Sequence, residues 1–198
     1  MTGRPRLALA LTAALAGPAG AAPELRADDA ARLGGYEATV GTALMEALNG
    51  GAAGDVAALT GALAGRPLEP AAASPEGDWT CRTMKLGGAL PLVVYGRFRC
   101  RITANGDGTW LFEKLSGSQR TRGTIWIQDG RAIYAGTGYV NDNVPTPYDE
   151  LPDEVLSGAG PQETPDVAVF EHVGGDRARL IFPAPHLESR LDVLELTR

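Results

Sequence analysis

A polar stretch at residues 113–123, EKLSGSQRTRG, holds the side chains best suited to bind a ligand. Guanidinium and ammonium groups beside hydroxyls and backbone N–H groups suit an anion such as a carboxylate, a phosphate or an acidic sugar. We expect the stretch to form a bend and to bind such an anion through Lys114, Ser116, Ser118, Gln119, Arg120 and Arg122. The alternative is an ordinary solvated hairpin loop.

Catalytic chemistry has weaker support in the sequence. A nucleophilic Ser118 would need a base, and the chain has only His172 and His186 to offer. No G-x-S-x-G elbow surrounds the serine. Glu113 and Asp192 would act as paired glycosidase carboxylates only if the fold brought them together. We therefore predict no catalytic residue, and an envelope hydrolase that uses Ser118 with either histidine is the rival function.

The segment at residues 141–155, NDNVPTPYDELPDEV, gathers acidic residues and prolines. Carboxylate oxygens suit calcium, but their spacing here matches no calcium-binding loop. We expect a long solvated loop that can lie over a binding site, and we predict no metal and no cofactor. A protein that inhibits a peptidase with one rigid loop is a further alternative.

Two cysteines, Cys81 and Cys100, lie within residues 77–102. A metal site would need further ligands, and the chain has no C-x-x-C motif, so a disulfide is the better interpretation. We place Cys81 opposite Cys100 in an antiparallel hairpin of residues 79–86 and 94–102.

This register assigns the two faces of the hairpin, because side chains alternate along a strand. Two further cross-strand pairs follow from it: Trp79 opposite Ile102, and Thr83 opposite Phe98. The other face then carries Arg82, Met84, Arg97, Arg99 and Arg101. The hairpin is therefore predicted to be apolar and cross-linked on one face and basic on the other.

The start of the chain resembles an export signal. Arg4 and Arg6 form a basic region, residues 7–16 an apolar run too short to cross a bilayer comfortably, and residues 19–21 an A-x-A cleavage site. We predict a signal peptide at 1–21 and a periplasmic or secreted protein that is not an integral membrane protein after cleavage. The alternative is an uncleaved anchor.

The charge balance excludes one class of partner. The chain has 18 lysines and arginines against 24 acidic residues, for a net charge of −6. Removal of the leader would make the protein more acidic still, which argues against nucleic-acid binding. Residues 79–131 are mainly basic and residues 132–198 mainly acidic. We expect the two segments to neutralise each other across neighbouring strands rather than to form opposite poles.

Residues 22–75 have helical periodicity followed by a proline-rich linker. A first helix at 36–48 would bury Tyr36, Val40, Leu44 and Leu48. A second, with Asp55 as its N-cap, would bury Val56, Leu59 and Leu63. The predicted helix hairpin would cap the main domain, and a partner-binding arm is the alternative.

Residues 76–198 have the pattern of short strands joined by turns. NGDG at 105–108, Asp129-Gly130 and GGD at 174–176 are turn signals between β-type runs. About eight consecutive strands of this kind close most readily into a barrel, or form a strongly curved sheet. The predicted class is thus α+β, mainly β: a helix hairpin followed by an antiparallel meander with one disulfide.

Gly77-Asp78-Trp79 resembles the G-x-W signature of lipocalin-like barrels. The resemblance implies that Trp79 plugs the closed end of a barrel and that an arginine packs across it. Arg190 is the candidate for that arginine, with Arg179 as second choice. The later lipocalin signatures are absent, so only architecture is carried over.

Five runs, DWTCRTMKLGG, LPLVVYGRFRCRI, FEKLSGSQRTRG, GTGYV and ESRLDVLEL, resemble an uncharacterised family of exported Gram-negative bacterial proteins, the domain of unknown function number 4893. The resemblance covers residues 25–198 and implies export and a single unit of helices plus sheet. It implies no activity. From the residues, we expect a non-catalytic module that binds a small anionic or amphipathic ligand, or an envelope component.

Overall fold

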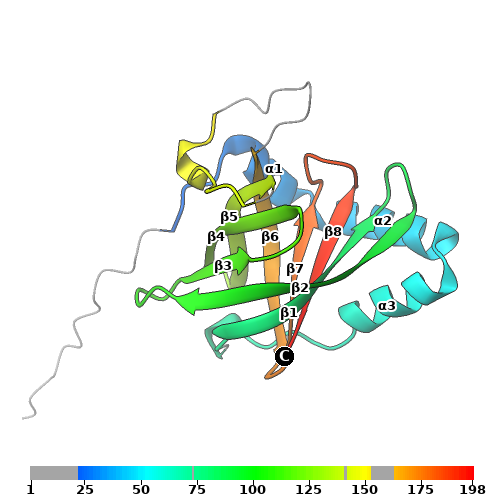
Figure 1. Cartoon of the computed structure of the whole chain (residues 1–198), viewed down its shortest axis with the longest axis horizontal. Coiled ribbons are helices and arrows are strands. Elements are labelled where there is room, and N and C mark those ends of the chain that lie inside the picture. Colours follow the sequence, from blue (N-terminus) through cyan, green and yellow to red (C-terminus); the bar gives the residue numbers. More distant parts are fainter. Residues whose placement is uncertain (1–21, 73, 141, 153–162) are drawn as a thin grey trace, which may run out of the picture.

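The computed structural model describes residues 22–72, 74–140, 142–152 and 163–198. Its main feature is a closed antiparallel barrel in which each strand pairs with the next and β1 pairs with β8 (Figure 1). The strands are β1 (Gly77–Leu86), β2 (Leu92–Ala104), β3 (Trp110–Lys114), β4 (Gln119–Gln128), β5 (Arg131–Val140), β6 (Glu163–Gly174), β7 (Arg177–Pro183) and β8 (Leu191–Thr197). The predicted meander is confirmed, and it closes into a barrel.

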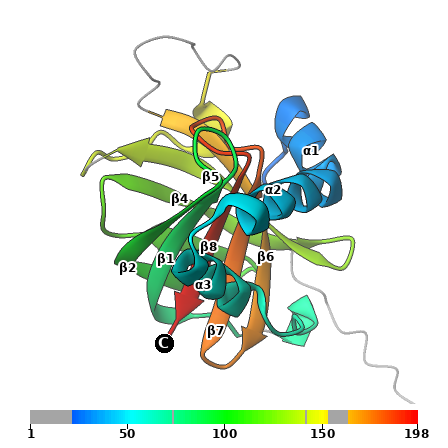
Figure 2. The same cartoon turned by 90° about the vertical axis from the view of Figure 1, so that its right-hand side faces the viewer.

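Three helices precede the barrel and lie against one side of its wall (Figure 2). They are α1 (Ala27–Gly34), α2 (Tyr36–Gly50) and α3 (Ala53–Leu63), and two 3-10 turns follow, η1 (Pro70–Ala72) and η2 (Tyr148–Glu150). The sequence predicted two helices. It missed α1 because this helix has only eight residues, and Leu33 is its one large apolar side chain, while the residue that it buries fully is Asp29. Within the described residues, no helix is both long and apolar enough to cross a bilayer.

The helix boundaries and faces differ in two details from the prediction. Asp55 is not an N-cap, because α3 begins two residues earlier and its cap position, Ala52, makes no side-chain hydrogen bond. Leu48 remains 48% exposed, whereas Ala43 and Ala47 are fully buried. A stripe of residues spaced by four drifts around a helix of 3.6 residues per turn, so its last member leaves the interface. Alanines let α2 approach the barrel wall closely.

Two apolar cores lie on the two sides of the barrel wall. The interior core contains Trp79, Cys81, Phe112 and Tyr134. The second core joins the helices to outward-facing strand residues such as Met84. Because successive side chains of a strand point to opposite faces, the same strands supply both cores.

A bulge in β2 lets this one strand serve both cores. Arg82 pairs with Arg97, and Met84 pairs with Val94. One residue of β1 therefore lies opposite two residues of β2, at positions 95–96. One extra residue exchanges the faces of a strand. Val94 therefore packs against the helices, while Cys100 enters the barrel.

The disulfide between Cys81 and Cys100 is present, with Cα atoms 5.9 Å apart. The predicted register is wrong by two residues: Cys81 lies opposite Phe98, and Cys100 lies opposite Trp79. The bond is thus diagonal, and Trp79 does not face Ile102. A shift of two preserves the face of every side chain. The cysteines are therefore inside, and the outer face carries Arg82, Met84, Arg97, Arg99 and Arg101, with Met84 covered by the helices.

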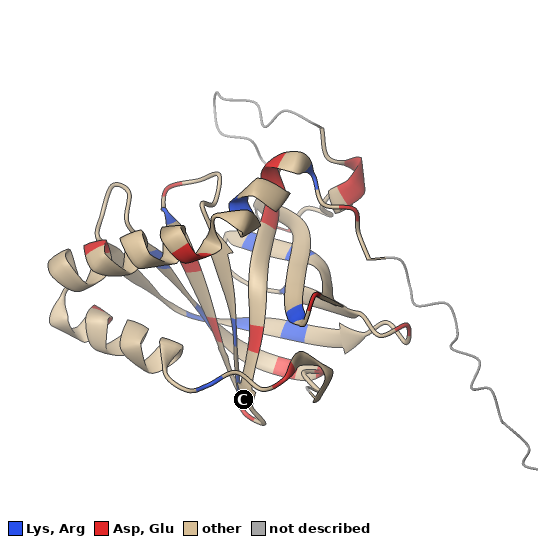
Figure 3. Ribbon diagram, turned by 180° about the vertical axis from the view of Figure 1, so that it is seen from behind, with Lys and Arg blue, Asp and Glu red and all other residues tan. Residues whose placement is uncertain are grey.

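Ion pairs connect the basic and acidic segments of the chain. Arg82 binds Glu195 with an N–O distance of 2.8 Å, from one strand to the next. Lys85 binds Glu188 at 2.8 Å, and Arg120 binds Asp142 at 2.7 Å. Seen from behind, basic and acidic residues are interspersed over the strands (Figure 3). This is the mutual neutralisation that we expected.

Trp79 closes the end of the barrel where β1 begins. It is 3% exposed, and its indole N–H donates to the carbonyl of Pro75 at 2.9 Å. The arginine over its ring is Arg198, 4.2 Å from the ring centre, rather than Arg190 or Arg179. Arg198 follows β8, whose antiparallel pairing brings Thr197 opposite Thr80. Arg190 precedes β8, at the other end of the barrel, where it pairs with Glu46 of α2 at 2.9 Å.

Arg179, the second choice, is also engaged elsewhere. Its guanidinium binds Glu171 at 2.5 Å and donates to the carbonyls of Ala62 and Ala64 at the C-terminal end of α3. It thus anchors the end of α3 to the outside of the barrel wall.

Candidate functional site

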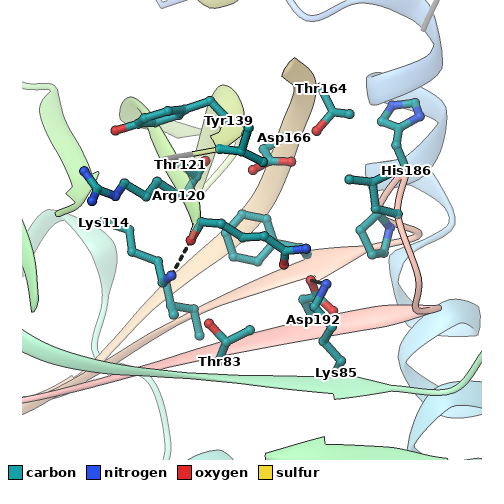
Figure 4. A pocket seen from close by; sticks show the side chains of 17 residues that line it. Thr83, Lys85, Lys114, Arg120, Thr121, Tyr139, Thr164, Asp166, His186 and Asp192 are labelled. Atoms are coloured by element: carbon teal, nitrogen blue, oxygen red, sulfur yellow. Dashed lines mark hydrogen bonds and ion pairs between the residues drawn. The ribbon is translucent and has the colours of Figure 1, made fainter. Parts of the chain in front are cut away.

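A cavity of about 110 Å³ lies at the barrel end opposite Trp79, beside the last residues of β3 and β5, the first residues of β4 and β6, and the β7–β8 connection. Figure 4 shows the side chains that surround it. Its apolar part includes Phe182, Leu187 and Leu194. Its polar part comprises Thr83, Lys85, Lys114, Gln119, Arg120, Thr121, Tyr139, Thr164, Asp166, His186 and Asp192. A space of this size suits several waters or a small organic molecule.

The short strand β3 shapes one side of the cavity. It pairs with β2 only from Cys100 to Ala104 and with β4 only from Arg122 to Ile125. In the described part of the chain, residues 92–99 of β2 and 119–121 of β4 therefore have no ladder partner from β3. Lys114, the last residue of β3, reaches into the cavity where this pairing ends.

Lys114 is a buried cation that lacks an acidic partner. It is 6% exposed, and its ammonium group donates to the Gln119 carbonyl and lies 4.2 Å from the centre of the Phe98 ring. It forms no ion pair with any carboxylate of the described residues. Burial, together with the positive charges of Arg120 and Lys85, lowers the pKa of Lys114 to about 8. An anion in the cavity would supply the missing charge.

Lys85 is equally buried but fully compensated. It is 7% exposed, and its ammonium lies 2.8 Å from Glu188 and 3.9 Å from Asp192. Burial lowers its pKa, but the two carboxylates outweigh burial, so the pKa of Lys85 is raised. Two lysines of the same cavity thus differ in one respect, the presence of a counter-charge.

Two carboxyl groups face the same cavity. Burial raises the pKa of both Asp166 and Asp192 to about 6. Asp192 accepts a hydrogen bond from the Ser189 hydroxyl at 2.5 Å and lies near Lys85. Asp166 has no ion pair with a described residue, and the neighbouring Thr121 hydroxyl only partly offsets the effect of burial on its pKa.

Asp166 owes its space to a glycine on the neighbouring strand. A Cβ atom at Gly138 would lie 2.7 Å and 2.9 Å from the two carboxylate oxygens of Asp166 and 2.9 Å from the Thr164 hydroxyl. Contacts this short do not occur in folded proteins, so a larger residue would displace Asp166. Toward the interior core, the cavity ends at a pair of hydroxyl groups. The hydroxyl of the fully buried Tyr134 lies 2.6 Å from that of Thr121.

The structure brings together three of the six residues that the sequence singled out. Lys114, Gln119 and Arg120 line the cavity. The Ser116 hydroxyl instead accepts the backbone N–H of Arg99 at 2.9 Å, and Ser118 lies in the β3–β4 turn outside the lining. Arg122 points out of the barrel and binds Glu113 at 3.1 Å. The predicted bend is also shorter than expected, because residues 113–114 and 119–123 belong to strands.

The sequence missed Lys85, Asp166, Asp192 and His186 as cavity residues. Each of the charged residues among them lies in a strand. Alternation shows which residues share a face of that strand, but not which face is inside the barrel. Charged residues are usually assigned to the outside, because isolated burial of a charge is unfavourable. Gly138 in GTGYV was the one local signal, since a glycine inside a strand often marks a close approach.

The groups of the catalytic alternatives lie apart. Neither ring nitrogen of His172 has a hydrogen-bond partner among the residues described, and its ring packs against Trp79 at the closed end, with ring centres 6.1 Å apart. His186 lines the cavity, yet among the described residues no hydrogen bond joins it to Ser118. Glu113 binds Arg122 outside the barrel, whereas Asp192 faces the cavity.

The acidic segment after β5 is described only from 142 to 152. There, Asp142 binds Arg120 at the cavity rim, and the Tyr148 hydroxyl donates to the buried Asp29 of α1 at 2.6 Å. The segment thus connects the cavity end of the barrel to the first helix. Residues 153–155 of the predicted loop lie outside the described residues. Among those described, no group of three or more acidic, histidine or cysteine residues is arranged to hold a metal ion.

Comparison with known proteins identifies a family but no relative of known function. The family model described as a domain of unknown function, DUF4893, matches residues 23–196. No curated protein and no solved structure matches the chain. Since the match spans nearly all of the described fold, helices and barrel together, the chain belongs to the DUF4893 family.

Proposed function

We propose that this protein is an exported, non-catalytic binding module whose barrel cavity takes a small ligand through an anionic group. The observation that carries the proposal is Lys114, a buried ammonium group without a carboxylate partner among the described residues, in a cavity with room for a small molecule. A buried charge is unfavourable unless it is paired. A bound carboxylate or similar anion would pair it.

The residues around Lys114 support an anionic ligand further. Arg120 lines the same cavity and adds a second positive charge at its rim. Its partner Asp142 has a side chain that is 91% exposed, and such solvated ion pairs contribute little free energy. A ligand can therefore replace Asp142 at small cost. Phe182 and Leu194 offer apolar contacts for the rest of the molecule.

Export is part of the proposal. The predicted signal peptide, residues 1–21, lies outside the described residues. The disulfide between Cys81 and Cys100 supports export, because such bonds persist in the periplasm or outside the cell and are rare in the cytosol. The helices, which bury apolar residues against the barrel wall, serve as a cap of the barrel rather than as a partner-binding arm.

Thermal unfolding in the presence of small anions tests this function. Acetate, propionate, lactate and phosphate would be titrated at pH 7 against the mature protein and two variants, Lys114→Met and Arg122→Ala. At least one anion is expected to raise the melting temperature of the wild type and of Arg122→Ala, whose side chain lies outside the cavity, but not that of Lys114→Met. If no anion stabilises the wild type, or if Lys114→Met responds equally, the proposal is wrong.

A further inference from the structure

Within the part of the chain that the structure describes, the cavity has one unpaired charge of each sign. Lys85 is compensated by Glu188 and Asp192, and Arg120 is compensated by Asp142. The two charged cavity residues that form no ion pair with a described residue are Lys114, from β3, and Asp166, from β6. They lie on different sides of the space drawn in Figure 4 and form no ion pair with each other.

Asp166 has unused hydrogen-bonding capacity toward the cavity. A carboxylate accepts about four hydrogen bonds, and of the described side chains only the Thr121 hydroxyl acts on Asp166 in this way. Among the described cations, Arg32 has the largest electrostatic effect on Asp166, but its ion pair is with Asp29, at 2.7 Å, and it forms none with Asp166. Asp166 can therefore accept further hydrogen bonds from a ligand in the cavity.

The surroundings of Asp166 favour a cationic donor over a neutral one. The Thr164 hydroxyl lines the cavity on the same strand and can accept a second hydrogen bond from a group beside Asp166. An ammonium group donates up to three hydrogen bonds and neutralises the partly buried carboxylate, whereas a hydroxyl donates one and leaves the charge in place.

We propose that the ligand of this cavity is a small zwitterion, with a carboxylate that binds Lys114 and an ammonium group that binds Asp166. The inference rests on the proposed function and narrows its ligand class to compounds of amino-acid type. The small cavity limits the ligand to a short carbon chain, which would contact Phe182 and Leu194.

Matched pairs of ligands test the inference. Glycine, β-alanine and γ-aminobutyrate would be compared by calorimetric titration at pH 7 with acetate, propionate and butyrate, which lack only the ammonium group. We expect at least one amino acid to bind about tenfold more tightly than its matched acid, and the best chain length to report the separation of the two side chains.

Three variants assign the effect to residues. Asp166→Asn keeps the size of the side chain and should abolish the tenfold preference while leaving the affinity for the simple acid unchanged or improved. Lys114→Met should abolish binding of both members of each pair. Glu113→Gln, a change on the outer face of the barrel, should leave both affinities unchanged.

The outcomes separate the two proposals. If simple acids bind through Lys114 and the ammonium group adds nothing, the zwitterion inference is overturned while the anion-binding function stands. If amino acids bind wild type and Asp166→Asn with the same preference, the role of Asp166 is overturned. If neither amino acids nor acids bind, both proposals fall.

Discussion

The ammonium group of Lys114 lies 4.2 Å from the centre of the Phe98 ring, so that an aromatic face and a carbonyl, rather than a carboxylate, hold a buried charge. An aromatic ring attracts a desolvated cation by about 2 kcal/mol. This does not replace the hydration that the lysine loses. The unpaired ammonium group therefore lowers the stability of the ligand-free protein, and a bound anion can restore it. Such a loss of stability is common at sites selected for binding.

Replacement of Lys114 by methionine should stabilise the protein in the absence of ligand. Methionine fills a similar volume and needs no counter-charge, so we expect the free energy of unfolding to rise by about 1–2 kcal/mol. Urea unfolding of the mature protein measures the change. Lys85→Met is the matched control and should destabilise by about 2 kcal/mol, because it leaves Glu188 and Asp192 without their partner. Equal effects of the two changes would contradict this account of Lys114.

The pH dependence of stability should differ between the wild type and Asp166→Asn. A folded-state pKa of about 6, above the unfolded value of about 4, means that Asp166 favours folding below pH 4 and that this contribution is lost as the pH rises through 6. The stability of Asp166→Asn relative to the wild type should therefore increase by about 1–2 kcal/mol between pH 4.5 and pH 7.

Other groups act in the opposite direction over the same pH range. Burial lowers the pKa of His172 and of His186, so their contribution to stability is lost as the pH falls below about 6.5. The wild type and Asp166→Asn both contain these histidines. The difference between the two proteins in free energy of unfolding therefore reports the contribution of Asp166. A difference that stays constant from pH 4.5 to pH 7 would show that Asp166 is not held in a desolvated site.

Loss of the disulfide should weaken the fold without removing the cavity. The bond joins residues 19 apart, and closing a loop of this length stabilises a protein by about 3 kcal/mol on the chain-entropy account. We expect Cys81→Ala combined with Cys100→Ala to lower the free energy of unfolding by about that amount in urea. Binding of any anion that the wild type recognises should persist below the unfolding temperature, because Lys114 and Asp166 lie outside the cross-link. An unchanged stability would contradict a structural role for the bond.

Gly138→Ala should disturb the cavity through a single methyl group. The added Cβ would press on the carboxylate of Asp166 and on the Thr164 hydroxyl, so we expect a loss of about 1–3 kcal/mol of stability and of any preference for an ammonium group. Gly61→Ala in α3 is the matched control. Nothing lies within 4 Å of its added methyl, and helix propensity should make it stabilising by about 0.5–1 kcal/mol.

Local signals were sufficient for the general architecture of the barrel. Asp129 and Gly130 both adopt the left-handed conformation that a two-residue hairpin turn requires, and the strands on either side pair from Gln128 and Arg131 onward. Alternation likewise predicted that Cys81 and Cys100 share the inner face. These predictions succeed because turn conformation and strand period depend only on near neighbours in the chain.

The register and the polar cavity were beyond such signals. The pairing of Cys100 with Trp79 depends on how β1 and β2 twist together and on the bulge at positions 95–96. Gly96 is the one residue type at this bulge that could have indicated it. Half of the predicted ligand site proved to lie outside the cavity: Ser116 and Ser118 precede β4, and Arg122 points away from the interior of the barrel. Thr121 is directed inward and Arg122 outward.

By itself, the sequence determined an antiparallel meander with helices before it and predicted the disulfide, since periodicity, turns and cysteines are local properties. It left a closed barrel and a strongly curved sheet as alternatives, and the tertiary structure decided for the barrel. Only the tertiary structure decided which charges meet. Lys114, Lys85, Asp166 and Asp192 come from four different strands, and barrel closure alone sets which of them pair and which remain without a partner. The free energy of a buried charge depends on its neighbours in space, and those neighbours are distant in the chain.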